Sequence, residues 1–458
     1  MTNFVFSRRV LQQSLNRLAA VIHREQLVSI VTRLNKPDKA RLPAMWELVM
    51  LDALSGYGLL RHEHPLPNGR RPDIELTVTP AKGTPFMIVG DVVCVSDAGL
   101  DEQNPVGVLS DELYRLAGKM ELNPNYFRYN VEGGRVGSYG DARIKLFLPG
   151  RGQLLELMQR EVASWMKKVK SDPLQPDSLE FSDQEIEFSI TYDPNKDCPG
   201  GGYLSYGVAA SRDKNPLFLA LKSKVKQLKQ ASSQAIRLII ACDGGCSLLS
   251  QSVQMNSPGT FSSREVAEDF LRQNSSIDAV LLVTVDATRP VLSNKTSYTM
   301  RYDLVIAPSN TRSPRMDTMA IASLKALLET ATHCVPEPIL NALNAAIRCG
   351  ESDFGPDMIG GYIMSNGNIS LSSRALQRLL AGEITADEFI NSHGWNDISG
   401  PSNPFVRMMR SGRMINKIEV ESTGQDDDWL KFSFGSIDSA IAPFQVPLPE
   451  PSIESNDT

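Results

Sequence analysis

The chain reads AMWELVMLDAL over residues 44–54, RRPDIELTV over 70–78 and PFMIVGDVVCVSD over 85–97. The first segment repeats apolar residues at helical spacing and stops at Ser55-Gly56, which predicts a helix with Glu47 near its start. The second segment alternates like a strand, with Asp73 at its beginning. The third is almost continuously apolar and predicts a strand buried on both faces. Because an unpaired buried charge is costly, Asp91 inside that strand needs a partner.

These three acidic residues predict a metal site. Asp73 and Asp91 belong to neighbouring strands, and Glu47 comes from the preceding helix. Their carboxylates would form an oxygen-rich site suited to Mg²⁺ or Mn²⁺. Such a metal can polarise a phosphodiester and supply hydroxide for in-line attack.

On these residues the chain resembles the PD-(D/E)XK nuclease superfamily, which has the restriction-endonuclease-like fold. Pro72-Asp73 matches its Pro-Asp, and Asp91-Val92-Val93 lies where its acid-x-Lys stands. Glu47 lies where many members carry a glutamate on helix one. This chain departs from the pattern at position 93, which is valine instead of lysine.

A second segment, residues 215–230, offers a replacement for the missing lysine. It predicts a capped amphipathic helix with Leu217, Leu221, Val225 and Leu228 on one face. Lys224 and Gln227 flank that face, and they resemble family members whose lysine has moved to a neighbouring helix or whose site carries a glutamine. The alternative, a solvated lysine face on an ordinary helix, stays open.

Composition limits the function classes. The chain has 458 residues, 41% hydrophobic and 22% charged, which is ordinary for a globular protein. It lacks an apolar run of about 18 residues and a secretory leader, so we expect a cytoplasmic protein without a membrane partner. Its six cysteines show no zinc spacing. With a net charge of −6, any DNA contact should be local and strongly salt-dependent, at Arg70, Arg71 and Lys222.

The pattern of helices and strands predicts an α/β protein with several parts. We expect a helical lead-in over 1–40 and a restriction-endonuclease-like core over 41–310, a mixed sheet flanked by helices. The core should carry an insertion at about 123–212. Residues 315–440 predict a mainly helical C-terminal module, and the Pro- and acid-rich tail 447–458 predicts disorder.

His62 and His64 flank Glu63 close to the Pro-Asp turn. A metal site or a general base is one interpretation of this pair. Exposed loop histidines are the interpretation that the sequence favours.

The resemblance implies a Mg²⁺- or Mn²⁺-dependent nuclease that hydrolyses DNA, in restriction or phage defence. Asp73 and Asp91 would bind the metal, and Glu47 would be a third ligand or would position water. Lys224 and Gln227 would orient the nucleophile or stabilise the pentavalent phosphate. The alternative is an inactive nuclease-like module that binds nucleic acid or a partner protein, such as a second defence protein, in a larger complex. A homo-oligomer is compatible with either function.

Overall fold

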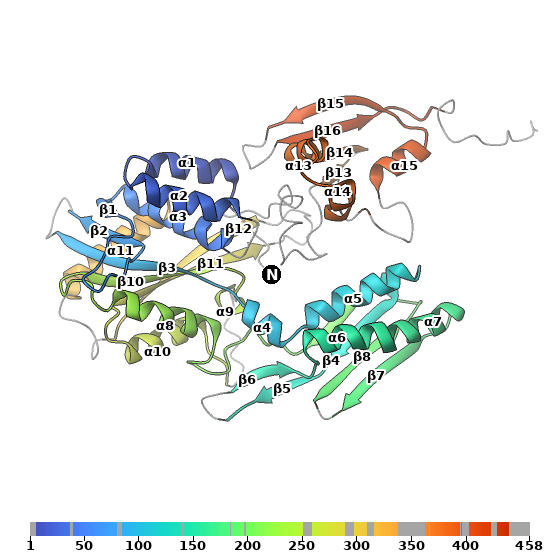
Figure 1. The fold of residues 1–458 in the computed structure, drawn as a ribbon, viewed down its shortest axis with the longest axis horizontal. Helices are drawn as coiled ribbons and strands as arrows, with labels where there is room; N and C mark the ends of the chain where they lie inside the picture. Colours follow the sequence, from blue (N-terminus) through green and yellow to red (C-terminus); the bar gives the residue numbers. More distant parts are fainter. Residues whose placement is uncertain are drawn as a thin grey trace, which may run out of the picture.

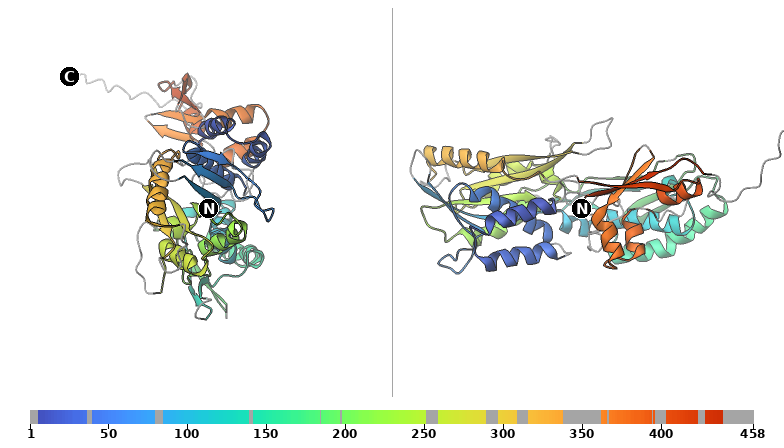
Figure 2. Two further views of the ribbon diagram at one scale, coloured as in Figure 1. Left: turned by 90° about the vertical axis from the view of Figure 1, so that its left-hand side faces the viewer. Right: turned by 90° about the horizontal axis from the view of Figure 1, so that it is seen from above.

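The computed structural model describes residues 6–36, 40–79, 85–138, 142–183, 185–196, 198–250, 259–288, 297–308, 316–337, 362–365, 367–393, 395, 403–422 and 428–438. These residues form a helix-flanked core and two smaller domains that both extend from one end of it (Figures 1 and 2). Residues 338–361 of the predicted C-terminal module and the predicted disordered tail 447–458 lie outside the described residues.

The core is built on a six-stranded mixed sheet with the order β1-β2-β3-β10-β11-β12. Its strands are β1 (Leu59–Arg61), β2 (Ile74–Val78), β3 (Phe86–Val95), β10 (Ile236–Asp243), β11 (Ala279–Thr288) and β12 (Ser297–Ile306). β1, β2 and β3 are antiparallel neighbours, whereas β3, β10 and β11 run parallel and β12 returns antiparallel. The predicted α/β class with a mixed sheet is therefore confirmed.

Helices cover both faces of this sheet (Figure 1). One face carries α1 (Arg8–Leu18), α2 (Arg24–Asn35), α3 (Arg41–Ser55) and α11 (Thr318–Thr332). The other carries α8 (Pro216–Leu228), α9 (Ser247–Ser250) and α10 (Ser263–Gln273). On β3, Ile88 and Val92 pack into the first layer, while Val89 and Val95 pack into the second. Since side chains alternate along a strand, Asp91 faces α8.

The segment between β3 and α8 forms a domain with a hydrophobic core of its own. After α4 (Ala98–Gln103), it contains the helices α5 (Val106–Lys119), α6 (Arg151–Leu157) and α7 (Ala163–Ser171). Its four-stranded sheet comprises, in order, β7 (Asp177–Asp183), β8 (Ile186–Tyr192), β4 (Phe127–Val131) and β9 (Gly200–Tyr203). A separate hairpin pairs β5 (Gly133–Val136) with β6 (Arg143–Leu146). The predicted start of the insertion at 123 is too late, because Leu109 and Leu113 of α5 are buried in this core.

The described part of the module that was predicted as mainly helical over 315–440 contains a four-stranded sheet that the sequence did not predict. α11 packs onto the central core through Leu324 and Leu328, and a separate α+β domain begins at residue 362. Its four-stranded sheet comprises, in order, β13 (Tyr362–Ser365), β14 (Asn368–Ser372), β16 (Trp429–Phe434) and β15 (Ile415–Glu421). Its helices are α13 (Ser373–Leu380), α14 (Ala386–Ser392) and α15 (Pro404–Arg410). The strands are short, and a short apolar run does not distinguish a strand from a helix.

Candidate functional site

The pairing of β2 with β3 brings Asp73 and Asp91 together. Ile74 lies opposite Gly90 in this antiparallel ladder, so the preceding residue, Asp73, comes to lie beside Asp91. The Asp73 side chain replaces the backbone carbonyl of a paired strand there, because its Oδ2 accepts the Val92 amide proton at 2.8 Å. On its other side, Asp91 is held by β10, where its partner is Ile239. The sheet therefore fixes the carboxylate of Asp73 and the backbone of Asp91.

The Asp91 carboxyl is buried and incompletely paired. It has 0% relative exposure, and its Oδ2 is a buried oxygen without a hydrogen-bond partner among the described residues. Burial, followed by the charge of Asp73, raises the pKa of Asp91 to about 8. Burial and then the charge of Glu47 likewise raise the pKa of Asp73. Two buried carboxylates with raised pKa values need a shared proton or a cation.

Lys224 supplies one positive charge to this pair. Its Nζ lies 3.3 Å from Asp91 Oδ1, and its side chain is 22% exposed. Burial alone would lower the pKa of Lys224, but Asp91, Asp73 and Glu47 together raise it, so that the ammonium form is retained at neutral pH. The solvated-lysine alternative is thereby excluded for this residue.

The position of Lys224 on α8 explains how it reaches the acids. Asn215 caps the helix by accepting the Phe218 amide proton at 2.9 Å. Leu217, Leu221 and Leu228 are buried against the sheet. Lys224 lies three residues after Leu221 and four before Leu228, so it belongs to the sheet-facing stripe itself. This spacing was the sequence signal for its direction.

Val93, the departure from the family motif, shares a face of β3 with Asp91, since side chains two residues apart on a strand point the same way. It packs against the layer of α8. A lysine at 93 would extend along the face on which Lys224 now lies. The ammonium group therefore comes to this face from a helix instead of from the strand.

Gln227 lies one turn after Lys224, but it contacts the backbone of the loop before Asp73. Its Nε2 donates to the Arg71 carbonyl oxygen at 2.7 Å. The side chains of Arg70 and Arg71 are exposed on this loop, and Lys222 is exposed on α8. These three cations are thus available to a phosphate backbone, as their predicted role requires.

Glu47 lies on the opposite side of the Asp73 loop and has partners that sequence reasoning missed. Arg33 of α2 donates to both of its oxygens, at 2.6 and 2.7 Å. His62 Nε2 lies 3.5 Å from Glu47 Oε1. The favoured interpretation of His62 as an exposed loop residue is wrong, since it is only 3% exposed. His64, by contrast, is partly exposed.

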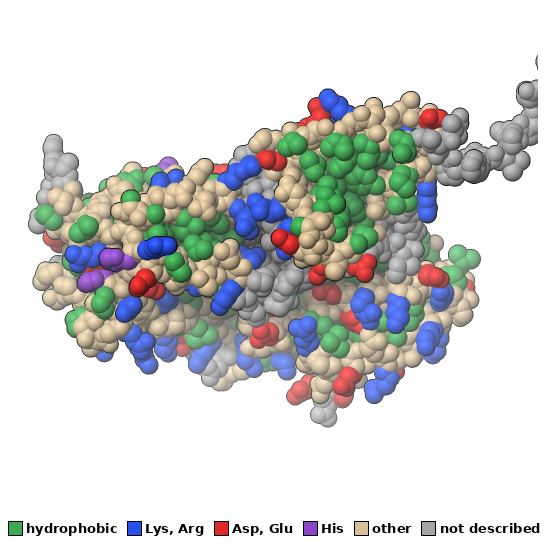
Figure 3. Space-filling model, turned by 45° about the horizontal axis from the view of Figure 1, so that its top comes forward, with side chains coloured by type: hydrophobic (Ala, Val, Ile, Leu, Met, Phe, Trp, Pro, Cys, Tyr) green, Lys and Arg blue, Asp and Glu red, His purple; other side chains and the backbone are tan. Residues whose placement is uncertain are grey.

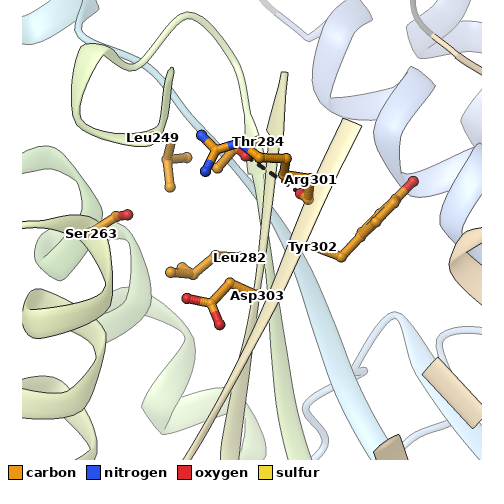
Figure 4. A pocket seen from close by; sticks show the side chains of 7 residues that line it. All are labelled: Leu249, Ser263, Leu282, Thr284, Arg301, Tyr302 and Asp303. Atoms are coloured by element: carbon orange, nitrogen blue, oxygen red, sulfur yellow. Dashed lines mark hydrogen bonds between the residues drawn. The ribbon is translucent and has the colours of Figure 1, made fainter. Parts of the chain in front are cut away.

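A separate cavity of about 300 Å³ lies on the same face of the sheet as Asp91, near the opposite edge, between β11, β12 and helices α9 and α10 (Figure 4). Its lining comprises Leu249, Ser263, Leu282, Thr284, Arg301, Tyr302 and Asp303. Its charged groups are already paired, Arg301 with Asp286 and Asp303 with Arg264. None of the predicted site residues lines it.

The described residues contain neither a ready-made metal cluster nor a membrane-spanning helix. In this part of the chain, no group of three or more His, Cys, Asp or Glu side chains is arranged to hold a metal ion. No helix among the described segments combines the length and apolar character needed to cross a bilayer. Comparison with protein-family models, curated proteins and solved structures finds no match.

Proposed function

We propose that this protein is a divalent-metal-dependent nuclease that hydrolyses DNA phosphodiester bonds. The observation that carries the proposal is the contact between Lys224 and Asp91, with Asp73 on the adjacent strand end. A buried acid pair beside a lysine combines oxygen ligands for a hard cation with a positive group for the phosphate. The mixed sheet flanked by helices supports the restriction-endonuclease-like fold that we propose with it.

The acid pair fits a hard cation. The unpaired Asp91 Oδ2 and the neighbouring Asp73 carboxylate are the oxygen donors that Mg²⁺ and Mn²⁺ prefer. A bound cation would offset the burial and the neighbouring negative charge that raise the pKa of both groups. When bound, Mg²⁺ would polarise the phosphodiester and lower the pKa of a coordinated water.

The other side chains have roles that follow from their positions. The Lys224 ammonium, kept charged by the acids, would neutralise a phosphate oxygen and orient the attacking water. Gln227 would hold the Arg71 backbone and thereby the loop that presents Asp73. The exposed cations Arg70, Arg71 and Lys222 would bind the DNA backbone. Restriction or phage defence is the biological role that we propose, and it rests on the family resemblance alone.

The direct test is DNA cleavage by the purified full-length chain with Mg²⁺ or Mn²⁺. Linear, circular and single-stranded DNA would be compared for wild type, Asp91→Asn, Lys224→Met and Lys226→Met. Lys226→Met is the matched control, because Lys226 is an exposed lysine of the same helix. Cleavage by wild type and Lys226→Met alone would support the proposal. Equal cleavage by all four proteins would point to a contaminant and reject the assigned site.

The second candidate is an inactive module that binds nucleic acid or a partner protein. Val93 favours it, and so does the C-terminal domain, on which apolar side chains gather at the surface (Figure 3). Exposed side chains of this domain include Leu380 (79% exposed), Ile418 (56%) and Val420 (66%). Absence of cleavage, with DNA binding that Asp91→Asn leaves unchanged, would establish this function instead.

A further inference from the structure

A continuous chain of contacts joins helix α2 to the backbone of Asp73. Arg33 holds both oxygens of Glu47, at 2.6 and 2.7 Å. Glu47 Oε1 faces His62 Nε2 at 3.5 Å, and the other ring nitrogen, Nδ1, lies 2.7 Å from the Asp73 carbonyl oxygen. Gln26, also on α2, donates to the His62 carbonyl oxygen. The two ends of the loop 62–73 are thus tied together and to α2.

The atoms in this chain determine how it works. A carbonyl oxygen carries no proton, so the contact with Asp73 requires His62 Nδ1 to donate its N–H. Nε2 then lies 3.5 Å from Glu47 Oε1, a contact longer than a hydrogen bond, and the ring fills the space between the loop and α3. The side chain of His62 is 1% exposed and that of Glu47 is 11% exposed, so both are enclosed. The ring is enclosed and bonded at Nδ1, so it has little freedom to move. It therefore holds the Asp73 backbone in place.

We propose that Arg33 is a positioning residue for the acid pair. Its guanidinium binds both carboxylate oxygens of Glu47, which fixes His62 and, through His62, Asp73. Glu47 then acts as an anchor, because Arg33 already occupies both of its oxygens. The consequence for metal binding rests on the proposed nuclease function. The positioning itself can be measured without metal.

A second arginine that forms an ion pair with α3 provides a matched control. Arg17 of α1 grips Asp52 of α3 in a similar way, with Nε 2.9 Å from Oδ1 and Nη2 2.5 Å from Oδ2. The Asp52 carboxylate also accepts from the Ser14 hydroxyl, at 2.7 Å. Arg17 and Arg33 thus make the same type of ion pair with α3, but only the pair of Arg33 leads on to Asp73 within the described contacts.

The decisive readout is hydrogen exchange of the Val92 amide, which donates to Asp73 Oδ2 at 2.8 Å. Exchange would be measured in EDTA for wild type, Arg33→Gln, Arg33→Lys and Arg17→Gln, with β10 amides as the reference for global opening. We expect Arg33→Gln to speed Val92 exchange at least about tenfold relative to β10, and Arg17→Gln to leave the ratio unchanged. The Val92 exchange rate of Arg33→Lys should lie between these two, because lysine keeps the positive charge but lacks the paired N–H donors of a guanidinium.

The same proteins would then be titrated with Mn²⁺. Loss of a residue that orients a metal ligand typically weakens binding about 10- to 100-fold, and we expect this for Arg33→Gln but not for Arg17→Gln. If wild type binds no Mn²⁺, the nuclease proposal fails, while Val92 exchange still decides the positioning. Equal Val92 exchange in Arg33→Gln and Arg17→Gln would overturn the inference. Should Arg33→Gln unfold, the same comparison between Arg33→Lys and Arg17→Gln decides it.

Discussion

Two aspartates on adjacent strands of the central sheet, Asp91 on β3 and Asp243 at the end of β10, are buried to the same degree but satisfied in different ways. Asp243 Oδ1 accepts the amide protons of Gly245 and Cys246 at 2.8 and 3.0 Å, and its Oδ2 accepts that of Val285 at 3.4 Å. Asp91 faces a second carboxylate and a lysine, and one of its oxygens is unpaired.

The difference separates a structural acid from one suited to chemistry. Burial is the main cause that raises the pKa of both groups, to about 6 for Asp243 and about 8 for Asp91. Backbone amides moderate the rise at Asp243, whereas the charge of Asp73 adds to it at Asp91. An acid held by amides stabilises a turn. An acid held beside another acid stores repulsion that a cation can relieve.

The largest expected effect concerns the lysine. Lys224→Met should reduce DNA cleavage by about 100- to 1,000-fold, the usual loss when one charge-stabilising donor is removed. Adding Val93→Lys should restore part of that activity, because residue 93 shares the Asp91 face of β3. Single-turnover cleavage rates measure both changes. A double variant no more active than Lys224→Met would contradict the view that the helix replaces the strand lysine.

Stability should respond differently to substitution of the two aspartates. Asp243→Asn turns an amide N–H₂ or a weaker acceptor toward backbone donors, and we expect it to lower the free energy of unfolding by roughly 1–3 kcal/mol. Asp91→Asn removes a charge that Asp73 repels, and Lys224 keeps Asp73 as a counter-charge, so it should change this free energy less than Asp243→Asn does. Urea denaturation in EDTA gives both values. Equal destabilisation by the two variants would remove the distinction between them.

The pH dependence of stability in the absence of metal should show the same difference between the two aspartates. A folded state with a raised carboxyl pKa holds protons that the unfolded chain has released above about pH 4. The resulting stability is present below that pH and is lost as the pH rises through about 6 for Asp243 and about 8 for Asp91. We therefore expect the melting temperature in EDTA to fall between pH 6 and 8. Asp91→Asn should abolish most of this fall, which thermal melts would show.

The smallest effect concerns the exposed arginines. Arg70→Ala and Arg71→Ala should each weaken DNA binding uniformly across sequences and reduce the slope of log affinity against log salt by about 0.9. Binding at several salt concentrations, in Ca²⁺ to suppress cleavage, measures the slope. Unchanged slopes in both variants would show that the DNA does not follow the loop before Asp73.

The sequence was sufficient to predict which residues of the candidate site come together and insufficient for their surroundings. Asp73 and Asp91 were found because strand pairing between segments adjacent in the sequence is readable from alternation and turns. Lys224 lies on a helix with a clear apolar stripe. Arg33 and the burial of His62 beside Glu47 were missed because side-chain contacts between separate helices and loops leave no periodic signal. The sheet of the C-terminal domain was missed because β15 is an exposed edge strand without a buried face.

Direct Mn²⁺ binding tests the central claim most simply. Wild type, Asp91→Asn and Asp243→Asn would be titrated with Mn²⁺ at pH 8, with calorimetry for affinity and electron paramagnetic resonance for free ion. We predict binding by wild type and Asp243→Asn, and at least about tenfold weaker binding by Asp91→Asn. Equal affinity of Asp91→Asn and wild type, or no binding by wild type, would contradict the assignment of the acid pair as the metal centre.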